Sequence, residues 1–244
     1  MTTRGSSRAS PSWFIVLCLG FLSLFLTAHD AFSQTRPRLL VYLHGNIKPR
    51  VLQSALADRL PGAEVVVLSR YRDFARELAN NPDAVLALEP VLAFHGLSVG
   101  LRGVRGGQDT ERYVLVSIGG TVPKDSFSSL TVGVVDLLGR EPTKKFVARL
   151  LGLHASPPLK YAVKTEDLLP LLQFRSADAV LVSERDAEEI RSSSKLELRV
   201  TPLDTRVGLA SVSFRTDAGR NGIKSGILAL DLATNRNLEV EGWR

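Results

Sequence analysis

Short apolar runs alternate with amphipathic stretches through most of the chain after residue 37. Three runs have the length and the β-branched content of buried strands: RLLVYLH (38 to 44), AEVVVLS (63 to 69) and DAVLAL (83 to 88). Between them, two stretches repeat apolar residues every three or four positions, as amphipathic helices do: IKPRVLQSALADRL (47 to 60) and YRDFARELANN (71 to 81). One face of the first helix carries Val51, Leu52, Ala55, Leu56 and Leu60. This pattern predicts the order strand, helix, strand, helix, strand.

The same order returns in the second half of the chain. Its predicted strands are LTVGVVDLL (130 to 138), LKYAVK (159 to 164) and DAVLVS (178 to 183). Its predicted helices are EPTKKFVARLLGL (141 to 153), TEDLLPLLQFRS (165 to 176) and ERDAEEIRSS (184 to 193). Pro142 suits a first helical turn, and we expect Thr165 and Ser183 to cap the two helices that follow them.

Two similar segments, DAVLALEP (83 to 90) and DAVLVSER (178 to 185), contain the third strand of each series. Two such series predict two lobes, each with a mostly parallel sheet covered by helices. One continuous sheet is the alternative, but residues 95 to 120 separate the series with a glycine-rich stretch that has no helical pattern. We expect hairpin and crossing strands there, and a tail with a strand near 195 to 203 and a final helix near 220 to 235.

The first 33 residues have the pattern of a secretory signal peptide. Arg4 and Arg8 precede a continuous apolar run (13 to 28), and AFS (31 to 33) places small residues where a signal peptidase reads them. We expect cleavage before Gln34 and a periplasmic product. An uncleaved N-terminal membrane anchor is the alternative, because the run is only slightly shorter than a membrane-spanning helix.

Composition narrows the chemistry that the exported part can perform. Cys18 is the only cysteine and lies in the apolar run, so disulfides and thiol chemistry are excluded from the exported part. The three histidines after the leader, His44, His95 and His154, lack metal-site spacing, and no catalytic motif is present. We therefore expect no cofactor, no metal and no enzymatic activity. The net charge of +6 is compatible with an anionic ligand or a membrane surface, and an exported chain has no nucleic-acid partner.

Several of these segments together resemble the type 2 periplasmic solute-binding proteins of ABC transporters, specifically the phosphate/phosphite/phosphonate-binding branch. The resemblance rests on the export signal, YLHGN, DAVLALEP, VGVVDLLGREPTKKFVARLLG and LLQFRSADAVLVSE. It implies an α/β fold of two lobes joined by two hinge strands near 117 to 120 and 201 to 204. The first lobe would comprise 34 to 116 plus 204 to 244, and the second 117 to 203.

The resemblance also implies a small anionic, phosphonate-like ligand between the lobes and a monomer that serves an inner-membrane ABC permease. The turn DLLGREP has no Ser or Thr before the helix proline, where members of this branch usually bind the oxyanion. This departure keeps a second hypothesis open, a sensory or interaction module that has the same fold and a sensor protein as its partner.

Candidate ligand-binding residues follow the predicted strands, because ligands of open α/β sheets bind beyond the carboxyl ends of the strands. They are His44, Asn46, Tyr71, Glu89, Asp136, Arg140, Thr143 and Ser183. Arg140 is either an anion ligand or a solvated arginine at a helix start. His44 with Asn46 forms either a binding loop or a capped turn, and Glu89 either binds an ammonium group or solvates a strand end. The glycine cluster at 100 to 107 reads as a hairpin turn, which presents Arg102 and Arg105 to a membrane or partner.

Overall fold

The computed structural model describes residues 36 to 44 and 48 to 244. The predicted signal peptide and Asn46 lie outside these residues. Within the described part, no helix combines the length and the apolar character needed to cross a membrane.

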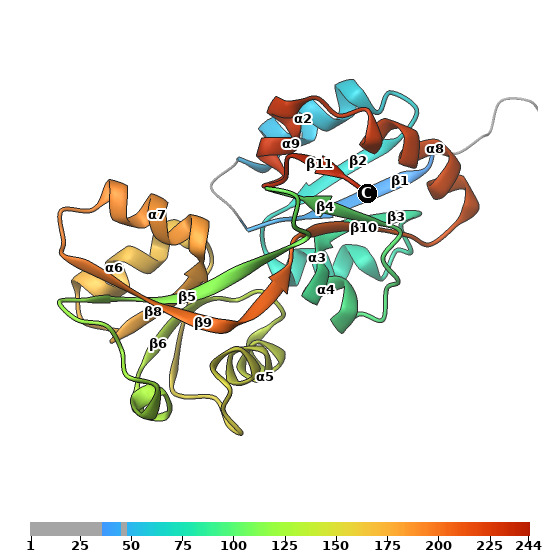
Figure 1. Ribbon diagram of the computed structural model, residues 1–244. Coiled ribbons are helices and arrows are strands. Elements are labelled where there is room, and N and C mark those ends of the chain that lie inside the picture. Colours follow the sequence, from blue (N-terminus) through green and yellow to red (C-terminus); the bar gives the residue numbers. More distant parts are fainter. Residues whose placement is uncertain (1–35, 45–47) are drawn as a thin grey trace, which may run out of the picture. The chain divides into compact units, whose positions relative to one another are not determined.

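A six-stranded mixed sheet forms the first lobe (Figure 1). Its parallel strands are β1 (Arg38–Tyr42), β2 (Glu64–Leu68) and β3 (Ala84–Leu88). Its antiparallel strands are β10 (Ala210–Phe214), β4 (Leu101–Val104) and β11 (Gly242–Trp243). The strand order is β11-β4-β10-β3-β1-β2.

Helices cover both faces of this sheet. One face packs against α2 (Pro49–Arg59), α8 (Asp217–Leu228) and α9 (Leu232–Asn237), and the other against α3 (Tyr71–Leu78) and α4 (Glu89–Phe94) (Figure 1). Side chains alternate along β1, so Leu39 and Val41 face α2 and α8, whereas Leu40 and Tyr42 face α3 and α4.

The second lobe repeats this plan around a five-stranded sheet of order β7-β6-β8-β5-β9. Its strands are β6 (Val132–Val135), β7 (Leu159–Ala162), β8 (Ala179–Ser183), β5 (Thr110–Ile118) and β9 (Leu198–Gly208). α5 (Arg140–Leu151) covers one face, and α6 (Leu168–Gln173) and α7 (Glu184–Ser193) cover the other (Figure 1). Short 3-10 turns, η1 (Lys124–Ser129) and η2 (Thr165–Asp167), precede β6 and α6.

One buried core passes from the first lobe into the second. It joins residues of β1, α3 and α4, such as Tyr42 and Phe74, to residues of β5, β6 and α5, such as Leu115 and Phe146. The two outer faces have separate cores under α2 and α8 and under α6 and α7. Apolar packing therefore runs directly between the lobes.

The prediction of two helix-flanked sheets is confirmed, with four differences. Each sheet is mixed rather than mostly parallel, because strands that return from the other lobe add to it in antiparallel orientation. The chain passes between the sheets at 105 to 109 and at Leu209, whereas the expected hinges at 117 to 120 and 201 to 204 lie at the end of β5 and within β9. The expected final helix is two helices, α8 and α9, and α4 follows β3 directly without having been expected.

Two local predictions were wrong. The side chain of Val51 is 56% exposed, because α2 buries Leu52 and Leu56 and turns Val51 to solvent. Thr165 makes no capping hydrogen bond, because it lies inside η2. In contrast, the Ser183 side chain accepts a hydrogen bond from Asp186 N and caps α7 as expected.

The repeated Asp of DAVL has the same structural role in both lobes. Asp83 Oδ2 accepts a hydrogen bond from Arg38 N at 2.8 Å, and Asp178 Oδ2 accepts one from Thr131 N at 2.8 Å. Each aspartate thus binds the backbone at the start of the neighbouring first strand. Asp83 also accepts a hydrogen bond from Thr216 Oγ1 at 2.7 Å. The repeated Asp therefore makes the same side-chain to backbone hydrogen bond between the first and third strands of each series.

We expect Asp83→Ala to lower the free energy of unfolding by about 1–2 kcal/mol and Asp178→Ala by about 1 kcal/mol. Urea denaturation of both variants measures this, with Asp125→Ala on the exposed turn η1 as a control that changes stability by less than about 0.5 kcal/mol. The hydrogen bonds from Arg38 N and Thr216 lower the pKa of Asp83. Its contribution is therefore complete above the ordinary carboxyl pKa and is lost as the pH falls through the lowered value. Equal effects of all three substitutions would contradict the assigned role.

Candidate functional site

The carboxyl ends of β6, β7 and β8 meet at one edge of the second sheet, where they surround a small cavity. Its volume is about 30 Å³, room for about one or two water molecules. Its polar lining consists of His44, Tyr113, Thr143, Thr165, Ser183 and Asp186. We call it the strand-end cavity. All of these residues except His44 belong to the second lobe, so His44 brings the first lobe to the same site.

The turn between β6 and α5 is held by its own side chains. Thr143 Oγ1 accepts a hydrogen bond from Leu138 N at 3.1 Å and lies 3.2 Å from Asp136 Oδ1, to which it donates. The hydroxyl is buried and its donor and acceptor roles are both used. Asp136 therefore places a carboxylate at the N-terminal end of α5, where an anionic ligand would otherwise bind.

At the end of β8, Ser183 and Asp186 form the second polar group of the cavity. Both residues are buried, and Asp186 N donates to Ser183 Oγ at 3.1 Å. The Asp186 carboxylate accepts a hydrogen bond from Arg185 at 3.3 Å. A second carboxylate thus lies at a helix start beside the cavity.

His44 follows β1 and is the first lobe's contribution to the cavity lining. Its Nδ1 is buried and has no hydrogen-bond partner among the described residues. A buried ring nitrogen without a partner costs free energy unless water or a ligand satisfies it. His44 is therefore the side chain of the first lobe best placed to gain from an occupant of the cavity.

Aromatic side chains of the first lobe contact the same turn of the second lobe. Tyr42 Oη donates to the carbonyl oxygens of Leu137 at 3.2 Å and Asp136 at 3.4 Å. Burial and the negative charge of Asp136 raise the pKa of Tyr42 far above its ordinary value, so the phenol remains a donor. Tyr71 lies so close to Gly139 that a Cβ placed there would be 2.9 Å from its ring.

Two predicted residues lie elsewhere. Arg140 is exposed, and its guanidinium carbon lies 5.7 Å from the centre of the Tyr161 ring. Glu89 begins α4 and pairs with Arg102 at 3.6 Å. The structure thus brings together His44, Thr143 and Ser183 around the cavity, with Asp136 next to Thr143 and Tyr71 next to the turn, whereas Arg140 and Glu89 have other partners.

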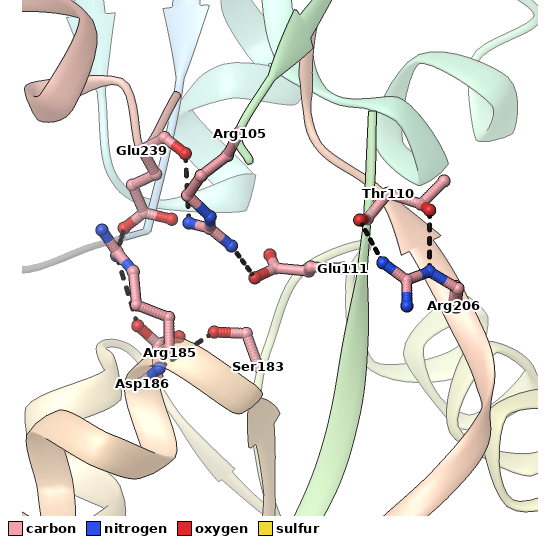
Figure 2. Close-up of polar contacts among 8 residues, drawn as sticks. All are labelled: Arg105, Thr110, Glu111, Ser183, Arg185, Asp186, Arg206 and Glu239. Atoms are coloured by element: carbon pink, nitrogen blue, oxygen red, sulfur yellow. Dashed lines mark hydrogen bonds and ion pairs between the residues drawn. The ribbon is translucent and has the colours of Figure 1, made fainter. Parts of the chain in front are cut away.

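A charged network borders this site (Figure 2). Arg185 pairs with Glu239 of the first lobe, and Arg105 pairs with Glu111 of β5. Arg105 also donates to the backbone carbonyl of Glu239 at 3.2 Å. Burial raises the pKa of Glu111 to about 7, although the neighbouring Arg105 lowers it. Charges of both lobes therefore meet beside Asp186.

Sequence reasoning missed several residues of this region, among them Tyr42, Tyr113, Thr165, Arg185 and Asp186. Thr165, Arg185 and Asp186 did have a usable signal, since all three follow a predicted strand end within three residues. Tyr42 and Tyr113 had none, because a tyrosine within a strand is common in any α/β chain. Among the described residues, no three His, Cys, Asp or Glu side chains are grouped as metal ligands.

The two helix-flanked mixed sheets, joined by two passages of the chain, define a two-lobed periplasmic-binding-protein-like α/β fold. Their strand orders match through β2-β1-β3-β10 and β7-β6-β8-β5. In such a fold, ligands bind at strand ends that face the other lobe. The strand-end cavity has this position, with lining residues from both lobes.

Several solved structures are similar to this chain in fold. XAC2383 from Xanthomonas citri, bound to chloride ion, has a TM-score of 0.65 with 14% identity, over 86% of this chain and 91% of that one. The substrate-binding protein of an amino acid ABC transporter has a TM-score of 0.55 with 15% identity, over 83% and 96%. The periplasmic VFT2 domain of BvgS from Bordetella pertussis has a TM-score of 0.53 with 14% identity, over 83% and 92%. No protein-family model and no curated protein sequence matches this chain.

Proposed function

We propose that this chain is a non-enzymatic, periplasmic solute-binding protein that holds a small polar ligand at the strand-end cavity. The observation that carries this proposal is the meeting of His44 from one lobe with Thr143, Thr165 and Ser183 from three strand ends of the other. The substrate-binding protein of an amino acid ABC transporter is among the similar structures, which supports delivery to a membrane permease. A ligand larger than about two waters requires the side chains or the lobes to move apart.

The charges at the cavity favour a ligand that carries a positive charge or donates hydrogen bonds. Asp186 lines the cavity and Asp136 lies next to it, and although Arg185 contacts Asp186, the described residues that line the cavity include no Lys or Arg. The phosphonate-like anion implied by the sequence resemblance would meet these two carboxylates at short range. We therefore propose amines and amino acids before phosphonates as ligands.

A thermal-shift screen of the purified protein tests this proposal. The panel contains phosphate, alkylphosphonates, sulfonates, amino acids and polyamines. A ligand present at a hundred times its dissociation constant stabilises the folded state by about 2.7 kcal/mol, which should raise the melting temperature by about 5–10 °C. We expect a basic or neutral amino compound to give this shift.

Variants on α7 identify the site of any ligand that is found. Asp186→Asn should abolish the shift for a cationic ligand, whereas Glu188→Gln, on an exposed position of the same helix, should retain it. A shift given only by phosphate or phosphonates would overturn the proposed ligand class. Silence across the panel, in a protein shown to be folded by circular dichroism, would overturn the solute-binding function.

A second candidate is a sensory or interaction module that holds no solute. The observation in its favour is the direct contact of the lobes, in which Tyr42 donates a hydrogen bond to the Leu137 carbonyl. The cavity beside this contact has a volume of only about 30 Å³. The periplasmic VFT2 domain of BvgS is among the similar structures. Pull-down of a membrane sensor by the chain, together with silence in the screen, would support this candidate.

A further inference from the structure

Glu239 interacts with two arginine side chains, Arg185 of the second lobe and Arg105 of the turn that connects the sheets. It follows α9 in the first lobe, and its carboxylate pairs with Arg185 at the start of α7 in the second lobe. Its backbone carbonyl accepts a hydrogen bond from Arg105, whose side chain also pairs with Glu111 on β5 (Figure 2). Arg105 lies in the turn between β4 and β5, where the chain passes from one sheet to the other.

The backbone at Glu239 has an unusual conformation. Its φ is 62°, in the left-handed region where a side chain with a Cβ costs free energy and glycine is preferred. The backbone here closes the end of α9, with Val240 N donating to Asn235 O, and this turn presents the Glu239 carboxylate to Arg185.

The side chains of Arg185 and Glu239 are partly buried in this network. Breaking a buried ion pair leaves uncompensated charge, but the intact pair itself adds little net stability, because both groups lose hydration. Arg185 Nε is buried without a partner in the described part of the chain, so the network is incompletely satisfied even when intact. Separation of the lobes would return these charged groups to water and restore part of the hydration that they lose in contact.

We propose that Arg105, Glu111, Arg185 and Glu239 form an interlobe latch, which favours lobe contact in addition to the shared apolar core and weakens that contact when the Arg185–Glu239 pair breaks. Asp186 neighbours Arg185 and lines the strand-end cavity, so the latch lies next to the site without depending on a ligand. Release would separate the start of α7 from the C-terminal segment of the first lobe. The latch goes beyond solute binding, and its failure would leave that proposal intact.

Proton binding at Glu111 gives the latch a pH dependence. The charged and titratable groups that face Glu111 are Arg105, Tyr113, Arg185, Asp186 and Glu239. Burial raises the pKa of Glu111 to about 7, and separation of the lobes would hydrate it and return the pKa toward its ordinary value. The closed form therefore binds the proton more tightly, so lobe contact is favoured at pH 6 and weakens as the pH rises through about 7.

Pulsed electron paramagnetic resonance on the ligand-free protein measures lobe separation directly. Spin labels are attached at Asp58→Cys on α2 and Gln173→Cys on α6, both exposed, with Cys18→Ser to prevent a third label. The chain is expressed with its own leader and purified as the cell processes it. The readout is the ratio of the long-distance to the short-distance population.

We expect Glu239→Gln and Arg185→Gln to raise this ratio by about tenfold, an effect typical of a lost, partly buried ion pair. Glu239→Gly removes the same carboxylate while relieving the left-handed backbone, and should raise the ratio similarly. Lys124→Gln, which breaks the exposed pair with Asp204 inside the second lobe, is the matched control and should not change it. Between pH 6 and 8.5 the wild-type ratio should rise severalfold, and Glu111→Gln should abolish this change.

Two results would overturn the latch. One is a ratio in Glu239→Gln and Arg185→Gln equal to that of the wild type or of Lys124→Gln. The other is a rise seen only in Glu239→Gly, which would assign the effect to backbone flexibility rather than to charge. If Arg185→Gln fails to fold by circular dichroism, the two Glu239 variants decide the question.

Discussion

Phe74→Ala should lower the free energy of unfolding by about 3–5 kcal/mol, the largest effect expected for a single core substitution in this chain. The Phe74 side chain is completely buried, and its ring stacks on Tyr42 at 4.7 Å between ring centres. It also meets the edge of His95 at 5.6 Å. Truncation would leave a cavity under Tyr42 that the stiff β1 strand cannot fill. Urea denaturation measures the loss as a lower midpoint at constant m-value.

Phe94→Ala is the matched control, because Phe94 contacts the same histidine, with 5.0 Å between ring centres. Its side chain is 47% exposed, so its removal should cost about 1 kcal/mol or less. Equal losses in the two variants would show that Phe74 does not support the core shared by the lobes. A large loss confined to Phe74→Ala would support the assigned role of Phe74 in the buried core that also contains Tyr42.

The parallel strands of both lobes could be predicted, because a strand that is buried on both faces is a continuous apolar run in the sequence. All five residues of β3 and all five of β8 are buried. Each strand is preceded by an Asp that binds the backbone of the neighbouring strand. The antiparallel additions were harder to predict. β5 and β9 pair with partners far away in the sequence, so no local pattern shows at which residue the chain changes sheets.

The candidate site was predicted where backbone geometry alone decides it. Thr143 and Ser183 reach one cavity because the carboxyl ends of the parallel strands β6 and β8 lie at the same edge, and His44 reaches it from the end of β1 in the other sheet. The same rule predicted Arg140 and Glu89 as site residues, but long side chains can reach several alternative partners. Arg140 lies over Tyr161 and Glu89 pairs with Arg102, and neither contact follows from spacing in the sequence.

The contacts among the interlobe charges could not be predicted from the sequence. Glu111, Arg185 and Glu239 occupy positions where exposed charged residues are ordinary, in a strand, a helix and a turn. Only the fold brings them together, since the Arg185–Glu239 pair joins the two lobes. The left-handed backbone at Glu239 was equally hard to predict, because glycine is the usual residue at such a helix end and none stands there.

Gly139→Ala should lower the free energy of unfolding by about 2–5 kcal/mol, for two separate reasons. The backbone at Gly139 has φ 82° and ψ 155°, a region essentially restricted to glycine. In addition, a Cβ there would lie 2.9 Å from the Tyr71 ring of the first lobe. The substitution strains the turn that begins α5 and pushes the two lobes apart at once.

Two other glycines separate these causes. Gly152→Ala has the strain alone, because its φ is 68° and nothing lies within 4 Å of an added Cβ, so we expect a loss of about 1 kcal/mol. Gly120→Ala has neither feature and should be close to neutral. Combining Gly139→Ala with Tyr71→Ala in a double-mutant cycle, measured by urea denaturation, should recover the part of the loss that comes from the clash. If the double mutant recovers nothing, the loss belongs to the backbone of the turn, and the contact between Tyr71 and Gly139 does not set the distance between the lobes.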